Sequence, residues 1–223
     1  MSDILNSMRL DFYIIRANFK MLIAPAYILA IVLGVLTQAT YMIVLIVMFI
    51  SAISSGMFFS VYEKNNLSKL YGFLPLGKSE VVMGRYLYAL LFGIINEIVS
   101  LTLTYIVSQI LNKGIGQLEF SACISGSFLF FCLSVGIQFP IYFKFGFSKA
   151  YIFTNLPLYL IFISIFIIIR TSRKTNILSS LGQVIQYFTS NPAMVWVTGI
   201  GLGIILFYLS FLLSSVIYKK SEL

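Results

Sequence analysis

Histidine is absent from this sequence of 223 residues, and charged side chains are scarce. Its absence removes the commonest general base and a frequent metal ligand. Only 10% of the residues are charged, whereas 60% are hydrophobic and the mean hydropathy is +0.99. In water such a chain could not cover its apolar side chains, but in a bilayer the lipid acts as the solvent. The composition therefore predicts an integral membrane protein.

Cysteine and aspartate are also rare, which narrows the possible chemistry. Cys123 and Cys132 have a spacing that places them on opposite faces of a helix, so we expect neither a disulfide nor a metal site. The aspartates are Asp3 and Asp11, both close to the N-terminus. Intramembrane proteases need serine with histidine, paired aspartates, or glutamate and histidine around a metal. We therefore expect no enzyme activity in this chain, and no catalytic residue, cofactor or metal ligand.

Six apolar runs are candidates for transmembrane helices, which need about 20 residues to cross a bilayer. They cover residues 21–36, 41–61, 81–110, 120–141, 151–169 and 192–217. No internal repeat or soluble domain separates them. The sequence thus predicts an all-α polytopic membrane protein with six transmembrane helices, organised as one transmembrane domain over residues 1–223.

The basic residues are divided unequally between the two sides of these helices. If both termini lie on one side, eleven of the 15 lysines and arginines fall there and four fall on the other. Positively charged loops favour the cytoplasmic side, so we expect both termini in the cytoplasm. This distribution also accounts for the net charge of +8. Nucleic-acid binding is not expected, because no basic patch lies on a soluble fold.

The first 20 residues have the pattern of an amphipathic helix. The apolar residues that recur at spacings of three and four are Ile4, Met8, Phe12, Ile15 and Phe19. They form one stripe, which predicts a helix in the cytoplasmic membrane interface over residues 1–20. A simple extension of the first span is the alternative. The segment lacks the compact basic region of a cleaved signal peptide, so the first span is expected to remain.

The longest polar cytoplasmic stretch is expected between the second and third spans, over residues 62–80. Leu67, Leu70 and Tyr71 share one face at helical spacing. Gly72 and Pro75 would end that short helix. A short amphipathic helix held parallel to the membrane between two spans can dock a soluble partner. A solvated connector is the alternative.

Two other segments outside the spans also carry information. The loop over residues 142–150 contains Lys144 and Lys149, and either sets the topology or makes a second cytoplasmic contact. Residues 171–191 carry apolar side chains at positions i, i+4, i+7 and i+11, beginning at Ile177. This spacing predicts an amphipathic helix at the outer leaflet.

Residues 72–79 read G-F-L-P-L-G-K-S, which matches the phosphate-binding pattern G-x-x-x-x-G-K-[ST]. That loop needs a preceding strand and a following helix in a soluble α/β domain. It also needs a magnesium-holding aspartate on a later strand. Here the match lies in a connector between two membrane spans, and both aspartates precede it. We therefore expect no nucleotide binding by this chain.

Glu97 lies near the middle of the third predicted span, where an acidic side chain is costly and marks a functional candidate. Ser100, Thr104 and Ser108 continue on its side of the helix. No basic residue lies at comparable depth in any span. Two interpretations stay open. In the first, Glu97, Ser100 and Thr104 face a translocation path or a subunit interface. In the second, Glu97 is a carboxyl group that is hydrogen-bonded inside the bundle.

Three further patterns bear on helix packing. Small residues in the second span are expected to let helices approach closely; they are Ser51, Ser54, Ser55 and Gly56. Pro140 and Pro157 are expected to kink or end their helices. The aromatic-rich fourth and fifth spans are expected to face lipid and the membrane interface.

The stretch around the docking loop contains a set of residues at fixed spacing. They are Glu63, Asn65, Leu70, Tyr71, Leu74, Pro75, Lys78, Glu80, Val81, Val82, Gly84, Arg85 and Tyr86. This stretch resembles that of small bacterial ABC type-2 permeases, E-x-N-x-x-x-x-L-Y-x-x-L-P-x-x-(K/R)-x-E-(I/V)-V-x-(G)-(K/R)-Y. The expected six spans and interfacial helix extend the resemblance to the whole chain.

The resemblance implies a membrane subunit of an ATP-driven exporter in the bacterial cytoplasmic membrane. Such a permease pairs with a separate cytoplasmic ATP-binding subunit and with a second permease, identical or homologous. The helix 63–71 would be the coupling helix seated in a groove of the ATPase. The coupling residues would be Glu63, Asn65, Leu67, Leu70, Tyr71 and Pro75. The helix 1–20 would be the elbow helix, and segment 171–191 would cap the path.

The resemblance also bears on the substrate. Relatives export peptides, antibiotics, lipids or polysaccharides. This chain has no large extracellular domain and no aromatic-lined carbohydrate domain, which favours a hydrophobic or amphipathic substrate such as a peptide, toxin or antibiotic.

Two other classes are compatible with this topology. The substrate-binding membrane subunit of a vitamin importer has a similar length and also borrows ATPases, and it would hold its ligand in a pocket near the outer face. It does not need the docking loop over residues 63–80. A self-standing immunity or scaffold membrane protein would have no ATPase partner.

Overall fold

The computed structural model describes residues 24–65, 77–112, 114, 116–172 and 191–220, and all regular secondary structure in those residues is helical. The expected elbow helix over residues 1–20 lies outside the described residues. So do Leu67, Leu70, Tyr71 and Pro75 of the docking loop, and residues 173–190 of the expected outer helix.

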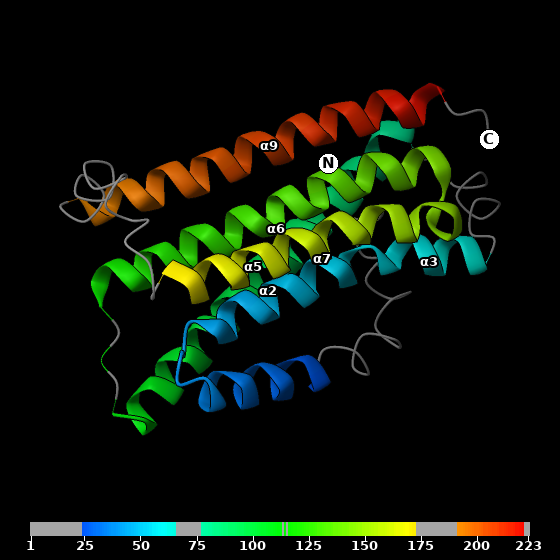
Figure 1. The fold of residues 1–223 in the computed structure, drawn as a ribbon. Helices are drawn as coiled ribbons and strands as arrows, with labels where there is room; N and C mark the ends of the chain where they lie inside the picture. The colour runs from blue at the N-terminus through cyan, green and yellow to red at the C-terminus, as the bar shows by residue number, and fades with distance from the viewer. Residues whose placement is uncertain (1–23, 66–76, 113, 115, 173–190, 221–223) are drawn as a thin grey trace.

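The described helices form a single elongated bundle (Figure 1). They are Ala24–Leu36, α2 (Met42–Ser55), α3 (Met57–Lys64), α5 (Lys78–Ile110), α6 (Gln117–Phe145), α7 (Phe147–Ser172) and α9 (Pro192–Lys220). Four stretches are long and apolar enough to cross a membrane: Met42–Lys64, Lys78–Ile110, Phe120–Phe145 and Ala193–Lys220. They correspond to the second, third, fourth and sixth predicted spans. The chain is therefore a multi-pass α-helical membrane protein, and the count of six spans stays a prediction.

The helix ends differ from the predicted spans by a few residues. α5 begins at Lys78 because Glu80 folds back and its Oε2 accepts a hydrogen bond from the Gly77 backbone N–H at 2.8 Å. An acidic side chain in the first turn also suits the positive end of the helix dipole. α6 and α7 both continue past their prolines, Pro140 and Pro157. The prolines therefore do not end their helices, and a kink at either one stays a prediction. The carbonyl that Pro140 leaves free, that of Gly136, accepts a hydrogen bond of 2.7 Å from the Ser210 hydroxyl of α9.

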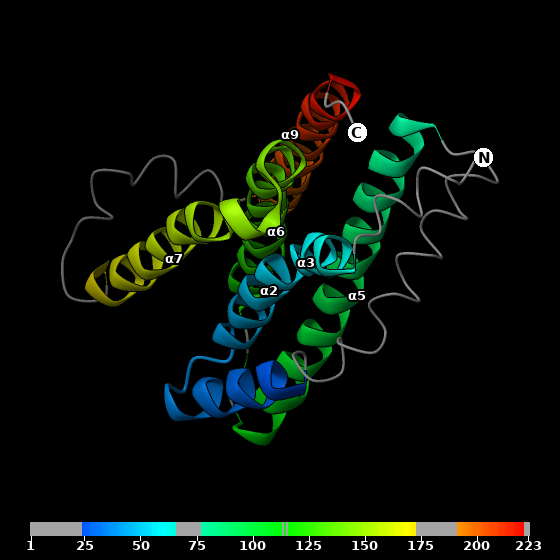
Figure 2. The same cartoon turned by 90° about the vertical axis from the view of Figure 1, so that its right-hand side faces the viewer.

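α6 lies at the centre of the bundle. It packs along α9 and also contacts α2, α5 and α7, which surround it in the rotated view (Figure 2). Its aromatic side chains Phe131, Phe139 and Tyr142 are accordingly buried. The expectation that the aromatics of the fourth span face lipid is therefore wrong. The apolar surface of the bundle is instead supplied by residues such as Ile95 on α5 and Leu213 on α9.

Small residues in the second span allow the close packing predicted for them. Ser51, Ser54 and Ser55 are all buried, and the hydroxyl groups of Ser54 and Ser55 donate to carbonyl oxygens of their own helix. Gly56 joins α2 to α3 beside Tyr142 of α6. A Cβ atom there would lie 2.9 Å from Tyr142 Cε2. The packing role is confirmed.

Gly93→Ala is expected to destabilise the bundle. A Cβ at Gly93 would lie 2.7 Å from Phe131 Cζ and closer still to Cε1. Phe131 is fully buried, so its ring cannot move aside, and overpacking of this kind costs about 1–3 kcal/mol. The measurement is thermal unfolding in detergent. The matched control is Gly126→Ala, where nothing lies within 4 Å of the added atom. Equal thermal shifts for the two variants would contradict the prediction.

Candidate functional site

A buried carboxyl group lies within the membrane-spanning part of α5. The Glu97 side chain is 6% exposed, and its Oε1 accepts a hydrogen bond of 2.6 Å from the Ser127 hydroxyl on α6. Its Oε2 is buried and has no hydrogen-bond partner among the residues that the structure describes. A carboxyl group in this setting can hold a proton, or accept a hydrogen bond from a polar group brought to it.

The polar stripe predicted around Glu97 is present and faces the interior. Ser100, Thr104 and Ser108 are all buried. The hydroxyl groups of Ser100 and Thr104 donate to backbone carbonyls one turn earlier in α5, at 2.9 Å and 2.8 Å. The helix therefore satisfies these donors, while their oxygens and the Glu97 carboxyl keep acceptor capacity.

Asn96, next to Glu97, connects α5 to the first described helix. Its Oδ1 accepts a hydrogen bond of 2.8 Å from the Tyr27 hydroxyl, and its Nδ2 donates to the Phe92 carbonyl. Asn96 and Glu97 thus reach different neighbours, one toward the helix Ala24–Leu36 and the other toward α6. The pair helps to fix the rotation of α5 in the bundle.

Two further polar clusters were missed in the sequence. The Tyr86 hydroxyl lies 2.6 Å from Ser210 Oγ and 2.7 Å from Ser214 Oγ, so it links α5 to α9. Between α6 and α7, Gln138 Nε2 donates to Asn155 Oδ1 at 3.1 Å. The signal that could have found the second cluster is the presence of these amides within apolar runs, where polar side chains need a partner.

One end of the bundle gathers the ends of five helices, and we call it the junction. It surrounds a cavity of about 250 Å³ lined by Phe59, Tyr62, Glu63, Arg85, Tyr142, Phe143, Gly146, Phe147 and Tyr218. Arg85 of α5 is 2% exposed, and its Cζ lies 4.3 Å from the centroid of the Tyr62 ring and 5.4 Å from that of Phe143. Stacking on aromatic faces suits a weakly hydrated guanidinium group.

Glu63 also lines the junction. Its Oε2 accepts hydrogen bonds from the backbone N–H groups of Phe147 at 2.8 Å and Ser148 at 3.0 Å. These are the first two residues of α7. A carboxylate at a helix N-terminus is favoured by the unpaired N–H groups there and by the helix dipole. Glu63 therefore joins the end of α3 to the beginning of α7.

The sequence singled out the coupling residues and the polar stripe around Glu97, and the structure places their described members in different parts of the bundle. Glu63 belongs to α3, and Asn65 follows as its C-terminal cap, with its N–H bonded to the Val61 carbonyl. The other proposed coupling residues lie outside the described part. Glu97 sits 12 residues beyond the junction residue Arg85 on α5, which is about 18 Å along the helix axis. The buried carboxyl and the junction are therefore distinct places in the bundle.

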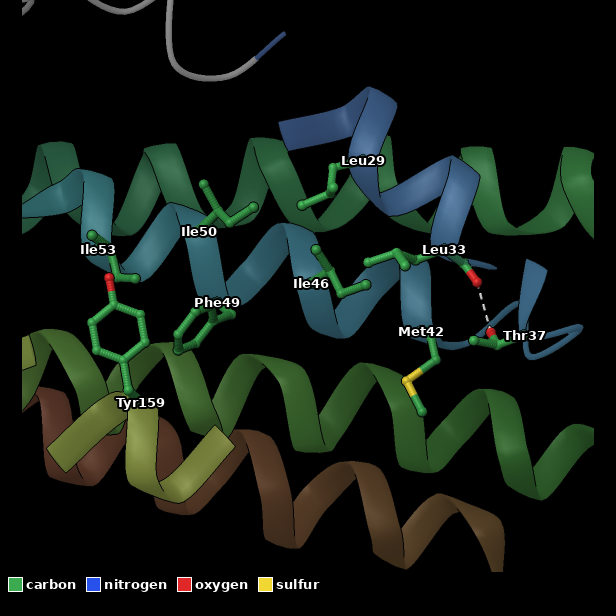
Figure 3. Close-up of a pocket in the computed structure, with 9 residues that line it drawn as sticks. All are labelled: Leu29, Leu33, Thr37, Met42, Ile46, Phe49, Ile50, Ile53 and Tyr159. Atoms are coloured by element: carbon green, nitrogen blue, oxygen red, sulfur yellow. Dashed lines mark hydrogen bonds between the residues drawn. The ribbon is translucent and has the colours of Figure 1, made fainter. Parts of the chain in front are cut away.

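An apolar groove lies on a third part of the bundle. Figure 3 shows residues from the helix Ala24–Leu36, α2 and α7 around a cavity of about 490 Å³. Leu33, Ile46 and Phe49 form part of the wall, and the lining residues within the described helices include no charged side chain. Tyr159 of α7 closes one end, with its ring 5.5 Å from that of Phe49 in an edge-to-face arrangement. The groove suits hydrocarbon rather than a polar ligand.

Long apolar helices and buried polar side chains at membrane depth define a polytopic membrane protein. A family model described as ABC-2 family transporter protein matches residues 8–219, almost the whole chain. The chain therefore belongs to the ABC-2 family of transporter proteins. Permeases of this family are membrane components that typically work with an ATPase subunit. No curated protein and no solved structure matches the chain.

Proposed function

We propose that this chain is the membrane-spanning permease subunit of an ATP-driven exporter. It forms the path for a hydrophobic or amphipathic substrate, such as a peptide, toxin or antibiotic, and a separate cytoplasmic ATPase supplies the energy. The observation that carries the proposal is the family match over residues 8–219. It is supported by the stretch over residues 63–86, whose spacing resembles that of small bacterial ABC type-2 permeases.

The orientation is supported by the distribution of charge. The described basic residues at the ends of helices that meet at the junction are Lys64, Lys78, Lys144, Lys149, Lys219 and Lys220. Positive charge favours the cytoplasmic side, so the junction faces the cytoplasm and both termini lie there. The chain then sits in the bacterial cytoplasmic membrane as one permease domain over residues 1–223. In this arrangement, the first span contains the helix Ala24–Leu36, and the 26-residue α7 is the fifth span.

The path is proposed to pass along the polar stripe of α5, with Glu97, Ser100 and Thr104 as its residues. Glu97 has the property that a path residue needs, because one of its oxygens has no partner within the described chain. A second permease copy, identical or homologous, would complete the transporter. The apolar groove supports the substrate class, since its lining offers hydrocarbon contact without charge.

Filling the groove is expected to reduce transport of a hydrophobic substrate. Ile50 lines the groove, so Ile50→Trp would occupy the space where apolar substrate is proposed to pack. We expect substrate stimulation of ATPase activity by a panel of hydrophobic peptides to fall several-fold, without loss of assembly. The control is Ile95→Trp, at a position on α5 that is 60% exposed to the surroundings of the bundle. Equal stimulation in both variants would remove the groove from the substrate route.

The test of the proposed function is purification of the tagged protein from native membranes in mild detergent, followed by mass spectrometry. We expect an ATP-binding cassette subunit at about one copy per permease. Recovery of the protein alone would count against the exporter and favour a self-contained membrane protein. Recovery with an energy-coupling importer module would favour the importer class instead.

A further inference from the structure

The Glu63 contact joins two elements that are far apart in the sequence. Glu63 lies at the end of α3, and the N–H groups that it binds belong to residues 84 and 85 positions later. One carboxylate oxygen receives both hydrogen bonds, so the contact is directional as well as electrostatic. Hydrogen bonds to an ionised acceptor are roughly twice as strong as neutral ones. A displacement of the end of α3 would therefore pull on the beginning of α7.

The turn before α7 is built to receive this carboxylate. Gly146 alone separates α6 from α7, and its φ of +77° is a conformation that residues with a side chain rarely adopt. Glycine has no side chain that could cap the helix, so Glu63 supplies the acceptor from another element. A Cβ at Gly146 would lie 3.4 Å from Glu63 Oε2, which shows how closely the carboxylate approaches the turn.

Glu63 lies directly before the segment on which an ATPase is proposed to act, so its hydrogen bonds to α7 bear on coupling. α3 ends one residue later, at Lys64, and the chain then enters the segment that carries the proposed ATPase-docking residues. The junction cavity of about 250 Å³ lies beside the contact, lined by both Glu63 and Gly146. Phe59 of α3 also packs its ring against those of Tyr142 and Phe143 at the end of α6. The Glu63 hydrogen bonds add a directional polar connection from α3 to the first residues of α7.

We propose that Glu63 is a positioning residue that passes movement of α3 to α7, instead of being a residue that binds the ATPase. The proposal rests on the proposed function, because it assumes that an ATPase acts on the segment after α3. The expected loop over residues 142–150 is wrong, because α6 and α7 leave only Gly146 between them. The proposal assigns this turn a role in transmission, since the turn moves with α3. The chain contains a natural comparison in Glu80, which accepts from the Gly77 N–H but stays within its own helix.

The first arm of the test uses the permease alone, in nanodiscs. Glu63→Gln is expected to raise hydrogen exchange at the amides of Phe147 and Ser148 by about tenfold, because the charge-assisted bonds are lost. Glu80→Gln, the matched control, should leave exchange at those two amides unchanged. Unchanged exchange in Glu63→Gln would overturn the proposal, whether or not an ATPase is ever found.

The second arm uses the permease–ATPase complex. Glu63→Gln is expected to retain the ATPase in pull-down but to lower the substrate transported per ATP by about tenfold, whereas Glu80→Gln keeps that ratio. The double variant Glu63→Gln/Ser148→Asp places a negative charge in the first turn of α7 without a connection to α3. This double variant should restore the thermal stability lost in Glu63→Gln. The amount of substrate transported per ATP should stay low.

The outcomes separate a coupling role from the alternatives. If the double variant regains the full ratio, Glu63 acts only as a helix cap and the proposal is wrong. Loss of the ATPase from Glu63→Gln would also overturn it, because Glu63 would then be a docking residue. If the wild-type permease itself retains no ATPase, the proposed function fails, and the exchange arm still decides whether Glu63 holds α7.

Discussion

Replacing Leu70 or Tyr71 with glutamate is expected to abolish co-purification of the ATPase while leaving membrane insertion intact. With Leu67, these residues form the apolar face predicted for the docking helix. A charge buried in such a contact has no partner to offset its lost hydration. Losses of about 2–4 kcal/mol are typical of residues central to an interface, and they correspond to roughly 30- to 1000-fold in Kd.

The measurement is pull-down from mild detergent, with insertion checked by yield and by size-exclusion chromatography. Ser68→Glu is the matched control, since it adds the same charge at a position that helical spacing places away from the apolar face. Retention of the ATPase by the Leu70 and Tyr71 variants would refute the assignment of this loop as the coupling helix. Loss of the ATPase in all three variants would point to a general effect of acidic charge.

Glu97→Gln is expected to reduce transport far more than assembly. Glutamine can still accept the 2.6 Å hydrogen bond from Ser127, so the contact between α5 and α6 is kept. What is lost is the acidic group, whose second oxygen has no partner in the described bundle. We expect a decrease in transport of about tenfold, since hydrogen bonds to charged groups contribute roughly 1.5–3 kcal/mol.

The matched control for Glu97 is Ser127→Ala, which removes the internal hydrogen bond and leaves the carboxyl group in place. It should lower thermal stability more than Glu97→Gln does, and lower transport less. Both properties can be measured on one preparation, by unfolding in detergent and by substrate uptake into inverted vesicles with the ATPase present. A wild-type transport rate in Glu97→Gln would make Glu97 structural and would exclude the stripe from the path.

The sequence located the candidate residues but not their partners. Glu97 stood out because an acid at membrane depth is costly, and its burial beside Ser100 and Thr104 agrees with helical spacing. Ser127 could not be chosen in advance from the many serines of α6, because the choice depends on the rotation of α6 against α5. Glu63 was grouped with the docking residues that follow it along the chain. Only the structure places its carboxylate on the α7 N-terminus.

The aromatic residues of α6 are a second case in which the sequence could not predict the neighbours of a side chain. Composition alone could not distinguish a span that faces lipid from one that is surrounded by other helices, since both are apolar where lipid is the solvent. The sequence therefore placed these rings at the lipid surface. In the structure Phe131 and Phe139 are fully buried among four neighbouring helices.

The sequence by itself determined the class of protein. Apolar runs long enough to cross a bilayer, few charges and basic loops on one side follow from the physics of transferring a chain into lipid, which acts on each segment separately. Tertiary structure decided which side chains meet. Helix rotation, the glycine turn at Gly146 and the contact of Glu63 with α7 depend on packing between segments up to 85 residues apart. That packing, and not segment composition, connects the end of α3 to the beginning of α7.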